Sequence, residues 1–178
     1  MPGGDAHPIP PRTEDGVQYR QLPAGSPEAR RLFAYRAAWA PPASPEEMGW
    51  GAWVKAGRSA ADAATEERLV AALLVERSGA TGMIHGPLVV EAEDPVEVAA
   101  QLLGAALFDA SAKGMKTLFA RPQGLDRVWV RFGFIPVPEA EAPCQLKGRP
   151  GAGLFAWRGG SALWSSRRPD ALEPDDPR

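Results

Sequence analysis

Histidine is the side chain best suited to proton transfer near neutral pH, and the chain has two, His7 and His85. His7 lies among prolines and glycines near the N-terminus, whereas His85 lies in an apolar run, residues 81–91 (TGMIHGPLVVE), that predicts a strand. His85 is therefore the histidine that could transfer a proton within the folded domain, and a strand histidine held by a local hydrogen bond is the alternative. Pro87 removes a backbone N–H two residues further on, which predicts a β-bulge or a sheet edge there.

Other common catalytic and ligand-binding patterns are missing from the sequence. Two histidines and the single Cys144, all far apart, do not have the spacing of zinc ligands, so no metal site is predicted. The glycine-rich and serine motifs of P-loop, dinucleotide-binding and hydrolase sites do not occur. A net charge of −2 and basic pairs no longer than two residues argue against a nucleic-acid partner.

Membrane association and secretion are not predicted either. No apolar run approaches the ~20 residues that a membrane helix needs. The N-terminal residues have no basic segment followed by an apolar one, as a signal peptide would. A lone cysteine cannot form an internal disulfide bond and fits a reducing compartment, so a cytoplasmic location is expected.

The length and composition predict one domain with two tails. The chain has 178 residues, of which 44% are hydrophobic and 24% are charged, as in an average globular protein. Residues 1–15 and 160–178 are rich in proline, glycine and polar residues and are predicted to be disordered tails. The domain that folds is therefore expected to span residues 16–159.

In the first third of the chain, start signals for two helices follow a strand pattern. Residues 17–22 alternate between apolar and polar, and Ser26-Pro27 then gives an N-cap and a first-turn proline. A capping-box pattern, S-x-x-E, begins at Ser44 and suggests a second helix. Trp50 and Trp53 follow between glycines, and their spacing is compatible with a helix or a strand, and with a packed lid or a ligand pocket.

The positions that could do chemistry are set by the middle of the chain, residues 68–137. Apolar runs at 68–77 and 81–91 predict two strands, and an amphipathic helix over 95–113 follows an N-cap at Asp94. A short buried strand at 117–120, a short helix at 126–132 ended by Gly133, and strands at 134–137 and 153–158 complete the order. This order predicts an α/β (α+β) fold with a central, mixed, mostly antiparallel sheet flanked by helices.

Two segments at the connections between these elements resemble the GNAT (Gcn5-related N-acetyltransferase) superfamily. One is the run IHGPLVV, residues 84–90, which leads into the long helix and is similar to the family's strand motif I-E-G-L-x-V. The other is VWVRFGF, residues 128–134, which looks like the family's F-Y-x-x-x-G-F corner between helix and strand. The resemblance covers about residues 17–158 and implies acyl transfer from acetyl-CoA to an amine.

The resemblance also implies roles for individual residues. His85 falls where many members carry a glutamate base. The backbone N–H groups of Leu88, Val89 and Val90 would face the acetyl-pantetheine arm of acetyl-CoA. Ala99 is the one small residue that matches the family's pyrophosphate motif, [QR]-x-x-G-x-[GA], at the start of the long helix.

The pyrophosphate motif and the acid position depart from the family pattern. Asp94 stands at the Arg or Gln position and Glu97 at the first glycine, so two carboxylates occupy a site meant for phosphate. Pro95 has no N–H to give, and Asp94 would accept from the N–H groups that the phosphate needs. Trp129 stands where the family has a tyrosine acid, and its indole cannot supply a catalytic proton.

Two hypotheses of function follow, and a third reading is an α+β domain unrelated to the GNAT superfamily. The first is an acyl-CoA-dependent N-acetyltransferase with a degenerate pyrophosphate-binding loop, acetyl-CoA as cosubstrate, and a small-molecule or protein amine as acceptor. The second is a non-catalytic GNAT-like module that binds a protein partner or a regulatory ligand. The sequence identifies neither an acceptor nor a partner.

Overall fold

The computed structural model describes residues 12–14, 16–56 and 66–159. The predicted tails, 1–15 and 160–178, lie outside these residues, except for Arg12–Glu14. These three residues form a short strand, β1, that pairs with β2 at the edge of the sheet. The prediction of disorder was therefore wrong for them, because edge pairing needs only backbone groups and no apolar side chains.

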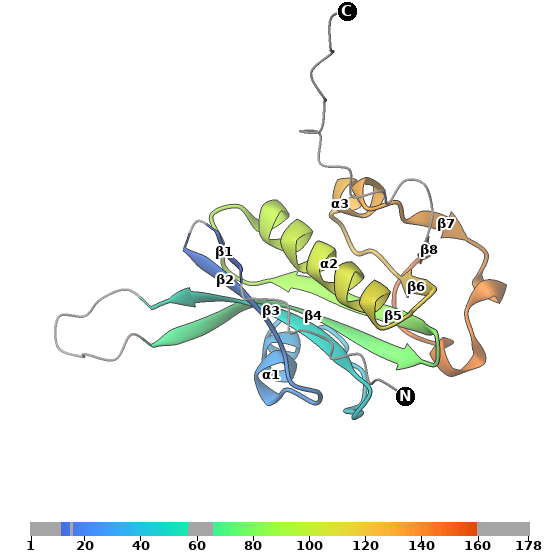
Figure 1. Ribbon diagram of the computed structural model, residues 1–178, viewed down its shortest axis with the longest axis horizontal. Coiled ribbons are helices and arrows are strands. Elements are labelled where there is room, and N and C mark those ends of the chain that lie inside the picture. Colours follow the sequence, from blue (N-terminus) through green and yellow to red (C-terminus); the bar gives the residue numbers. More distant parts are fainter. Residues whose placement is uncertain (1–11, 15, 57–65, 160–178) are drawn as a thin grey trace, which may run out of the picture.

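One sheet of eight strands, in the order β1-β2-β3-β4-β5-β6-β8-β7, forms the centre of the molecule (Figure 1). All neighbouring strands are antiparallel except β5 and β6, which are parallel. The mixed, mostly antiparallel sheet predicted from the sequence is thus confirmed. The remaining strands are β2 (Val17–Gln21), β3 (Met48–Lys55), β4 (Glu67–Ser78), β5 (Thr81–Val89), β6 (Thr117–Ala120), β7 (Ile135–Val137) and β8 (Leu154–Arg158).

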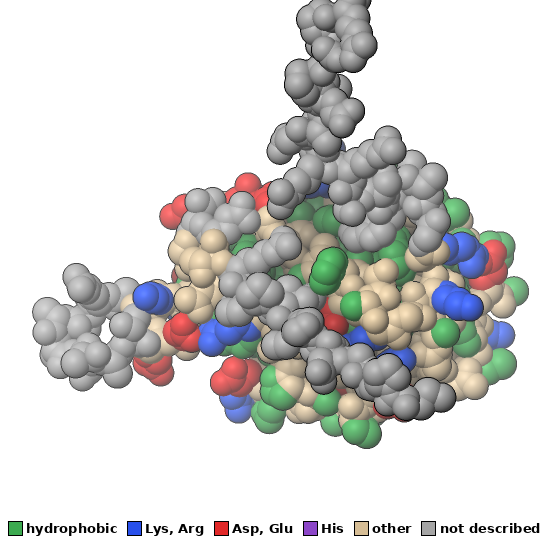
Figure 2. All heavy atoms as spheres, viewed as in Figure 1, with side chains coloured by type: hydrophobic (Ala, Val, Ile, Leu, Met, Phe, Trp, Pro, Cys, Tyr) green, Lys and Arg blue, Asp and Glu red, His purple; other side chains and the backbone are tan. Residues whose placement is uncertain are grey.

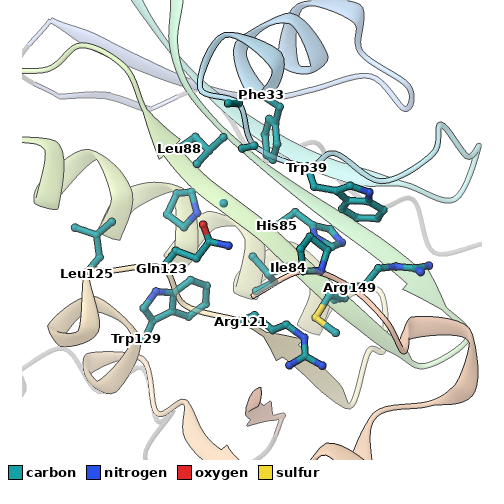
Figure 3. Close-up of a pocket in the computed structure, with 17 residues that line it drawn as sticks. Phe33, Trp39, Ile84, His85, Leu88, Arg121, Gln123, Leu125, Trp129 and Arg149 are labelled. Atoms are coloured by element: carbon teal, nitrogen blue, oxygen red, sulfur yellow. The ribbon is translucent and has the colours of Figure 1, made fainter. Parts of the chain in front are cut away.

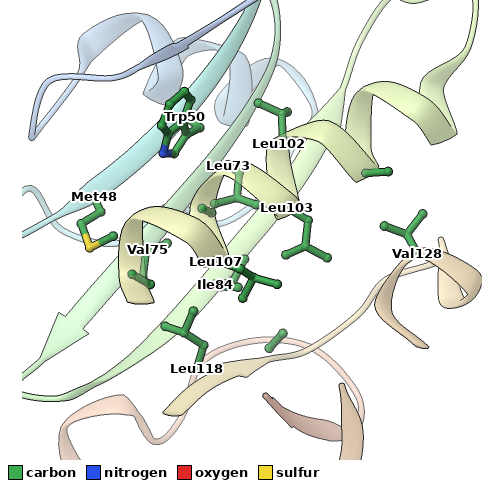
Figure 4. Packing of buried hydrophobic residues seen from close by; sticks show 14 of the residues in the cluster. Met48, Trp50, Leu73, Val75, Ile84, Leu102, Leu103, Leu107, Leu118 and Val128 are labelled. Carbon is green, nitrogen blue, oxygen red and sulfur yellow. The ribbon is translucent and has the colours of Figure 1, made fainter. Parts of the chain in front are cut away.

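Helices cover both faces of the sheet. Helix α1 (Pro27–Tyr35) lies on one face, and α2 (Pro95–Ala112) and α3 (Asp126–Arg131) lie on the other (Figure 1). The main core forms between α2 and the sheet, where leucines of the helix pack on side chains of β3, β4, β5 and β6 (Figure 4). Leu102, Leu103 and Leu107 have no exposed surface, as the predicted amphipathic stripe requires.

The capping-box pattern at Ser44 does not start a helix, so that prediction was wrong. Glu47 turns inward, with its side chain 2% exposed, and accepts hydrogen bonds from Arg30 Nη2 (2.9 Å) and from the N–H of Gly25 (2.9 Å). Because Glu47 binds across to α1 and its preceding turn, the chain continues from Met48 as strand β3. Trp50 on this strand is 2% exposed and belongs to the core.

The parallel pair β5–β6 stays together over only part of β5. The pairing ends at Ile84 and Ala120, where β6 ends, whereas β5 continues to Val89 along β4. The sheet therefore opens at His85. The register between β4 and β5 shifts at the same place, because Ala72 pairs with Leu88 but Leu74 pairs with His85. This shift confirms the bulge predicted at Gly86-Pro87.

Gly133 ends α3 as predicted. It has φ +83°, its N–H donates to Val130 O (3.0 Å), and the N–H of Phe134 donates to Trp129 O (3.1 Å). These two bonds are the Schellman pattern, which needs a left-handed residue after the helix.

Replacing Gly133 by valine is expected to lower the free energy of unfolding by about 1–2 kcal/mol. An added Cβ would meet nothing within 4 Å, so the loss comes from the left-handed backbone alone. Chemical denaturation measures it, with Gly133→Asn as the control, because asparagine tolerates this conformation. Equal stability of the valine and asparagine variants would contradict the assignment of this corner.

Within the described residues, no helix is long and apolar enough to span a bilayer. The same residues contain no group of three His, Cys, Asp or Glu side chains that could hold a metal ion. On the visible, described part of the face shown in Figure 2, acidic and basic side chains are interspersed.

Candidate functional site

The cleft where β5 and β6 separate is the candidate site. Its volume is about 240 Å³, and its walls come from β5, the chain after β6, the chain after α1, and α3. Figure 3 shows Phe33 and Trp39 on one side of this cleft and Leu125 and Trp129 on the other, with His85 between them. Because α1 and α3 cover opposite faces of the sheet, the cleft is lined from both faces.

His85 lies in this cleft and is hydrogen-bonded to a carboxylate. Its Nε2 lies 3.1 Å from Oε2 of Glu76, which projects from the neighbouring strand β4. The imidazole is 9% exposed and the carboxylate 17%. An ionised carboxylate can only accept hydrogen bonds, so Nε2 carries the proton and Nδ1 of a neutral His85 has the free lone pair.

Arg149 completes a chain of three charged or titratable groups. Its Nε donates to Glu76 Oε2 (2.9 Å) and its Nη2 donates to Glu76 Oε1. Nη2 also donates to the carbonyl of Gln145 (3.0 Å), and Nη1 to that of Lys147 (3.3 Å). Arg149 thus ties the loop before β8 to β4 and closes one end of the cleft.

These contacts determine the protonation of the pair. Burial lowers the pKa of the His85 imidazole; Glu76 opposes this and Arg149 adds to it, so the pKa lies below its ordinary value. Burial raises the pKa of the Glu76 carboxyl, but its hydrogen bonds and charge contacts with Arg149 and His85 outweigh this and lower it. At neutral pH, His85 is therefore neutral and Glu76 ionised, the states that a general base and its orienting partner need.

An exposed tryptophan covers His85. The rings of Trp39 and His85 have their centroids 5.0 Å apart, and the guanidinium carbon of Arg149 lies 5.3 Å from the centroid of the Trp39 ring. Trp39 is placed by Ala37, which has φ +51° directly after α1 and redirects the chain towards β5. A left-handed alanine is strained, and such strain is retained where the structure around it fixes the chain.

The residues predicted to bind the acyl donor do not all lie together. Leu88 lines the cleft. The N–H of Val90 donates to Val70 O on β4 (2.8 Å), so by the alternation of antiparallel pairs the N–H of Val89 faces the opposite, open edge of β5. Ala99, on α2, has no exposed surface and is not among the residues that line the cleft.

The start of α2 is capped by its own side chains, as the sequence predicts. Oδ1 of Asp94 accepts from the N–H of Glu97 (3.0 Å), and Pro95 occupies the first helical position. The carboxylate of Glu97 accepts from Gln101 Nε2 (2.9 Å) one turn further on. A donor that a bound anion would use is thus already engaged.

Trp129 lies in the wall of the cleft, at the position where the resemblance places a proton donor. It is 3% exposed and makes an edge-to-face contact with Phe134, with ring centroids 4.8 Å apart. Its indole is fixed in the wall and has no titratable proton.

Sequence reasoning found His85 but missed three residues that surround it: Trp39, Glu76 and Arg149. Glu76 lies nine residues before His85 across the β4–β5 hairpin, and a register drawn between the two predicted strands would have placed it nearby. Trp39 and Arg149 reach the site from 46 residues before and 64 residues after His85. Nothing in their local sequence points to the cleft.

Comparisons with known proteins gave structural matches only. No protein-family model matches the chain, and no curated protein does. A GNAT-family acetyltransferase from Staphylococcus aureus Mu50 is 6% identical, with a TM-score of 0.53 over 79% of this chain and 98% of that one. A Klebsiella pneumoniae protein assigned to the acyl-CoA N-acyltransferases is 14% identical, with a TM-score of 0.57 over 80% and 97%.

N-acetylglutamate synthase from Neisseria gonorrhoeae, in complex with coenzyme A and N-acetyl-glutamate, also matches. It is 17% identical, with a TM-score of 0.54 over 82% of this chain, and this chain spans 36% of its length. At these identities the likeness concerns the fold. The described sheet, its opening after Ile84 and the helices on both faces give this chain the fold of the GNAT acetyltransferases.

Proposed function

We propose that this protein transfers an acyl group from a thioester, acyl-CoA in the first instance, to an amine, with His85 as the general base. The observation that carries the proposal is the Glu76–His85 pair at the point where β5 and β6 separate. A neutral imidazole of lowered pKa, oriented by a carboxylate, suits removal of a proton from an ammonium group. The complex of N-acetylglutamate synthase with coenzyme A supports a CoA-type donor for this fold.

The reaction can be followed atom by atom. Nδ1 of His85 takes a proton from the acceptor, and the free amine attacks the thioester carbonyl. The C–N bond forms, the C–S bond breaks, and the thiolate leaves with the electron pair. Because Trp129 has no titratable proton, the imidazolium of His85 returns a proton to the thiolate, and the second proton of the acceptor ammonium passes to water.

Donor recognition is assigned to the thioester arm rather than to the pyrophosphate. The N–H of Val89 faces the open edge of β5 and is available to the carbonyl oxygen of the thioester or the pantetheine amides. At the start of α2, Asp94 holds the N–H of Glu97, and both carboxylates would repel a phosphate. The donor therefore gains little from its nucleotide part.

The self-capped helix also favours a second function, that of a non-catalytic binding module. If the start of α2 excludes CoA altogether, the cleft binds a ligand without acyl transfer.

The two functions differ in turnover, so an assay of thiol release from acetyl-CoA in the presence of a primary amine separates them. Cys144 is a free, exposed thiol, so a Cys144→Ser background keeps the thiol signal clean. Turnover above the rate without protein supports the enzyme; its absence over a range of amines and thioesters contradicts it.

Replacing Arg149 by glutamine is expected to shift the acidic limb of the pH profile of kcat/KM to higher pH. The positive charge of Arg149 lowers the pKa of His85, and its bonds to Glu76 weaken the attraction between Glu76 and the imidazolium. Without Arg149, the pKa of His85 rises, and a higher pH is needed to keep the base neutral.

NMR titration of the histidine ring protons gives the same pKa without any assay of turnover, since the chain has only two histidines. Arg158→Gln is the matched control, because it removes the same charge from an exposed pair with Glu141. A His85 pKa that is unchanged in Arg149→Gln, or that shifts equally in the control, would contradict the linkage between Arg149 and His85.

A further inference from the structure

The charges around the cleft restrict which amine it can accept. Among the described residues that line it, the ionisable side chains are His85, Arg121 and Arg149, and none is acidic. Both guanidinium groups are already bonded to carboxylates, Arg121 to Glu139 (2.5 and 2.6 Å) and Arg149 to Glu76. A second ammonium group on the acceptor would therefore find no carboxylate in the cleft and would lose hydration without compensation.

The rest of the lining is mostly apolar and aromatic. It comprises Phe33, Trp39, Met83, Ile84, Pro87, Leu88, Leu125 and Trp129, together with small residues and Gln123. In Figure 3, Trp39 and Phe33 face Trp129 and Leu125 across the cleft. Aromatic walls of this kind bind flat or branched apolar groups.

Trp39 is the one large aromatic side chain of this lining that remains widely exposed. It is 40% exposed, whereas Phe33 is 1% and Trp129 3% exposed. One part of its surface is covered by His85 and Arg149, and the strained turn at Ala37 holds it there. An exposed indole beside a general base leaves apolar surface that a ligand can cover while its amine reaches the imidazole.

We infer that Trp39 determines acceptor specificity, and that the acceptor is a primary amine with an aromatic or branched apolar body and no second positive charge. This inference rests on the proposed function and names the substrate class of the same site. The acceptor's body stacks on Trp39, and its nitrogen lies within reach of His85.

The test uses two probes, 2-phenylethylamine and 1,4-diaminobutane, with the full chain. Calorimetric titration without an acyl donor is expected to show binding of 2-phenylethylamine and none of 1,4-diaminobutane at the same concentrations. Trp39→Ala is expected to weaken binding of 2-phenylethylamine about tenfold, and Trp39→Phe to retain most of it. Tyr35→Ala is the matched control, because Tyr35 is an 81% exposed aromatic residue at the end of α1, outside the cleft.

Kinetics add a second readout. With acetyl-CoA as donor, Trp39→Ala should raise KM for the amine and leave KM for the donor unchanged. Equal affinity of wild type and Trp39→Ala, or binding of 1,4-diaminobutane as tight as that of 2-phenylethylamine, overturns the inference. Acyl transfer with a Trp39-independent KM overturns this inference alone, whereas Trp39-dependent binding without any transfer overturns the proposed function and leaves only the binding of apolar amines at Trp39.

Discussion

Replacing His85 by glutamine is expected to lower kcat/KM for acyl transfer about 10²- to 10⁴-fold, the contribution of a positioned general base. Glutamine can still donate to Glu76, so the hydrogen bond across β4 and β5 has a replacement. The lower kcat/KM then reflects the missing lone pair of the imidazole rather than a damaged sheet. Initial rates with saturating acetyl-CoA and varied amine give the ratio, and thermal melts of both proteins check that the fold is retained.

Glu76→Gln separates the orienting role of Glu76 from the chemical role of His85. It leaves the imidazole in place but removes the charge that selects its tautomer and stabilises its protonated form. Its rate should fall less than that of His85→Gln. Its acidic limb should move to lower pH, because Glu76 raises the pKa of His85. A His85→Gln variant with the wild-type rate would show that the acceptor is deprotonated elsewhere, and the proposed mechanism would fail.

Local sequence signals were sufficient for most of the fold. Asp94 and Pro95 fix the start of α2 through a side-chain cap and a preset φ, which depend only on neighbouring residues. Gly133 likewise identifies the end of α3 through a conformation that other residues avoid. Because such signals act within a few residues, they can be read from the chain without knowledge of its tertiary contacts.

The same local signals fail where a distant residue competes for the side chain. Ser44 and Glu47 have the spacing of a capping box, yet Glu47 is bonded to Arg30, 17 residues earlier. The Glu47 carboxylate is engaged by Arg30 and by the N–H of Gly25 and is not available as a cap, and the segment enters β3. No spacing rule within the segment contains that information.

The candidate site likewise combines one residue that local signals predict with others that they do not. His85 could be found because its residue type and its strand are local properties. Arg149 binds Glu76 from 73 residues further along the chain, and Trp39 reaches His85 from the segment after α1. Their convergence depends on the register of β4 with β5 and on the course of the loop before β8, both of which are products of tertiary packing. The sequence therefore singles out His85, and the structure adds the charged and aromatic side chains around it.

The second large expected effect concerns KM for the acyl donor and the segment at the start of α2, with Asp94 and Glu97. We expect KM for acetyl-pantetheine to lie within about threefold of KM for acetyl-CoA, because Asp94 already binds the N–H of Glu97 and two carboxylates at the start of α2 would repel a phosphate. Calorimetry with CoA alone should show no saturation at submillimolar concentration. A protein that binds CoA tightly and uses acetyl-pantetheine poorly would contradict the assignment of recognition to the thioester arm.

Restoring the family's pyrophosphate motif tests whether the helix cap of α2 weakens the binding of CoA. The double variant Asp94→Arg/Glu97→Gly should lower KM for acetyl-CoA and leave that for acetyl-pantetheine unchanged, because only the former carries phosphates. It should also lose about 1 kcal/mol of stability for the cap and a similar amount for the glycine. Glu28→Arg, in the first turn of α1 on the other face of the sheet, adds two of the three positive charges that the double variant adds and controls for that part of the change in net charge. If the double variant binds CoA more tightly and is less stable than the wild type, and Glu28→Arg shows neither change, the helix cap and the pyrophosphate compete for the same N–H groups.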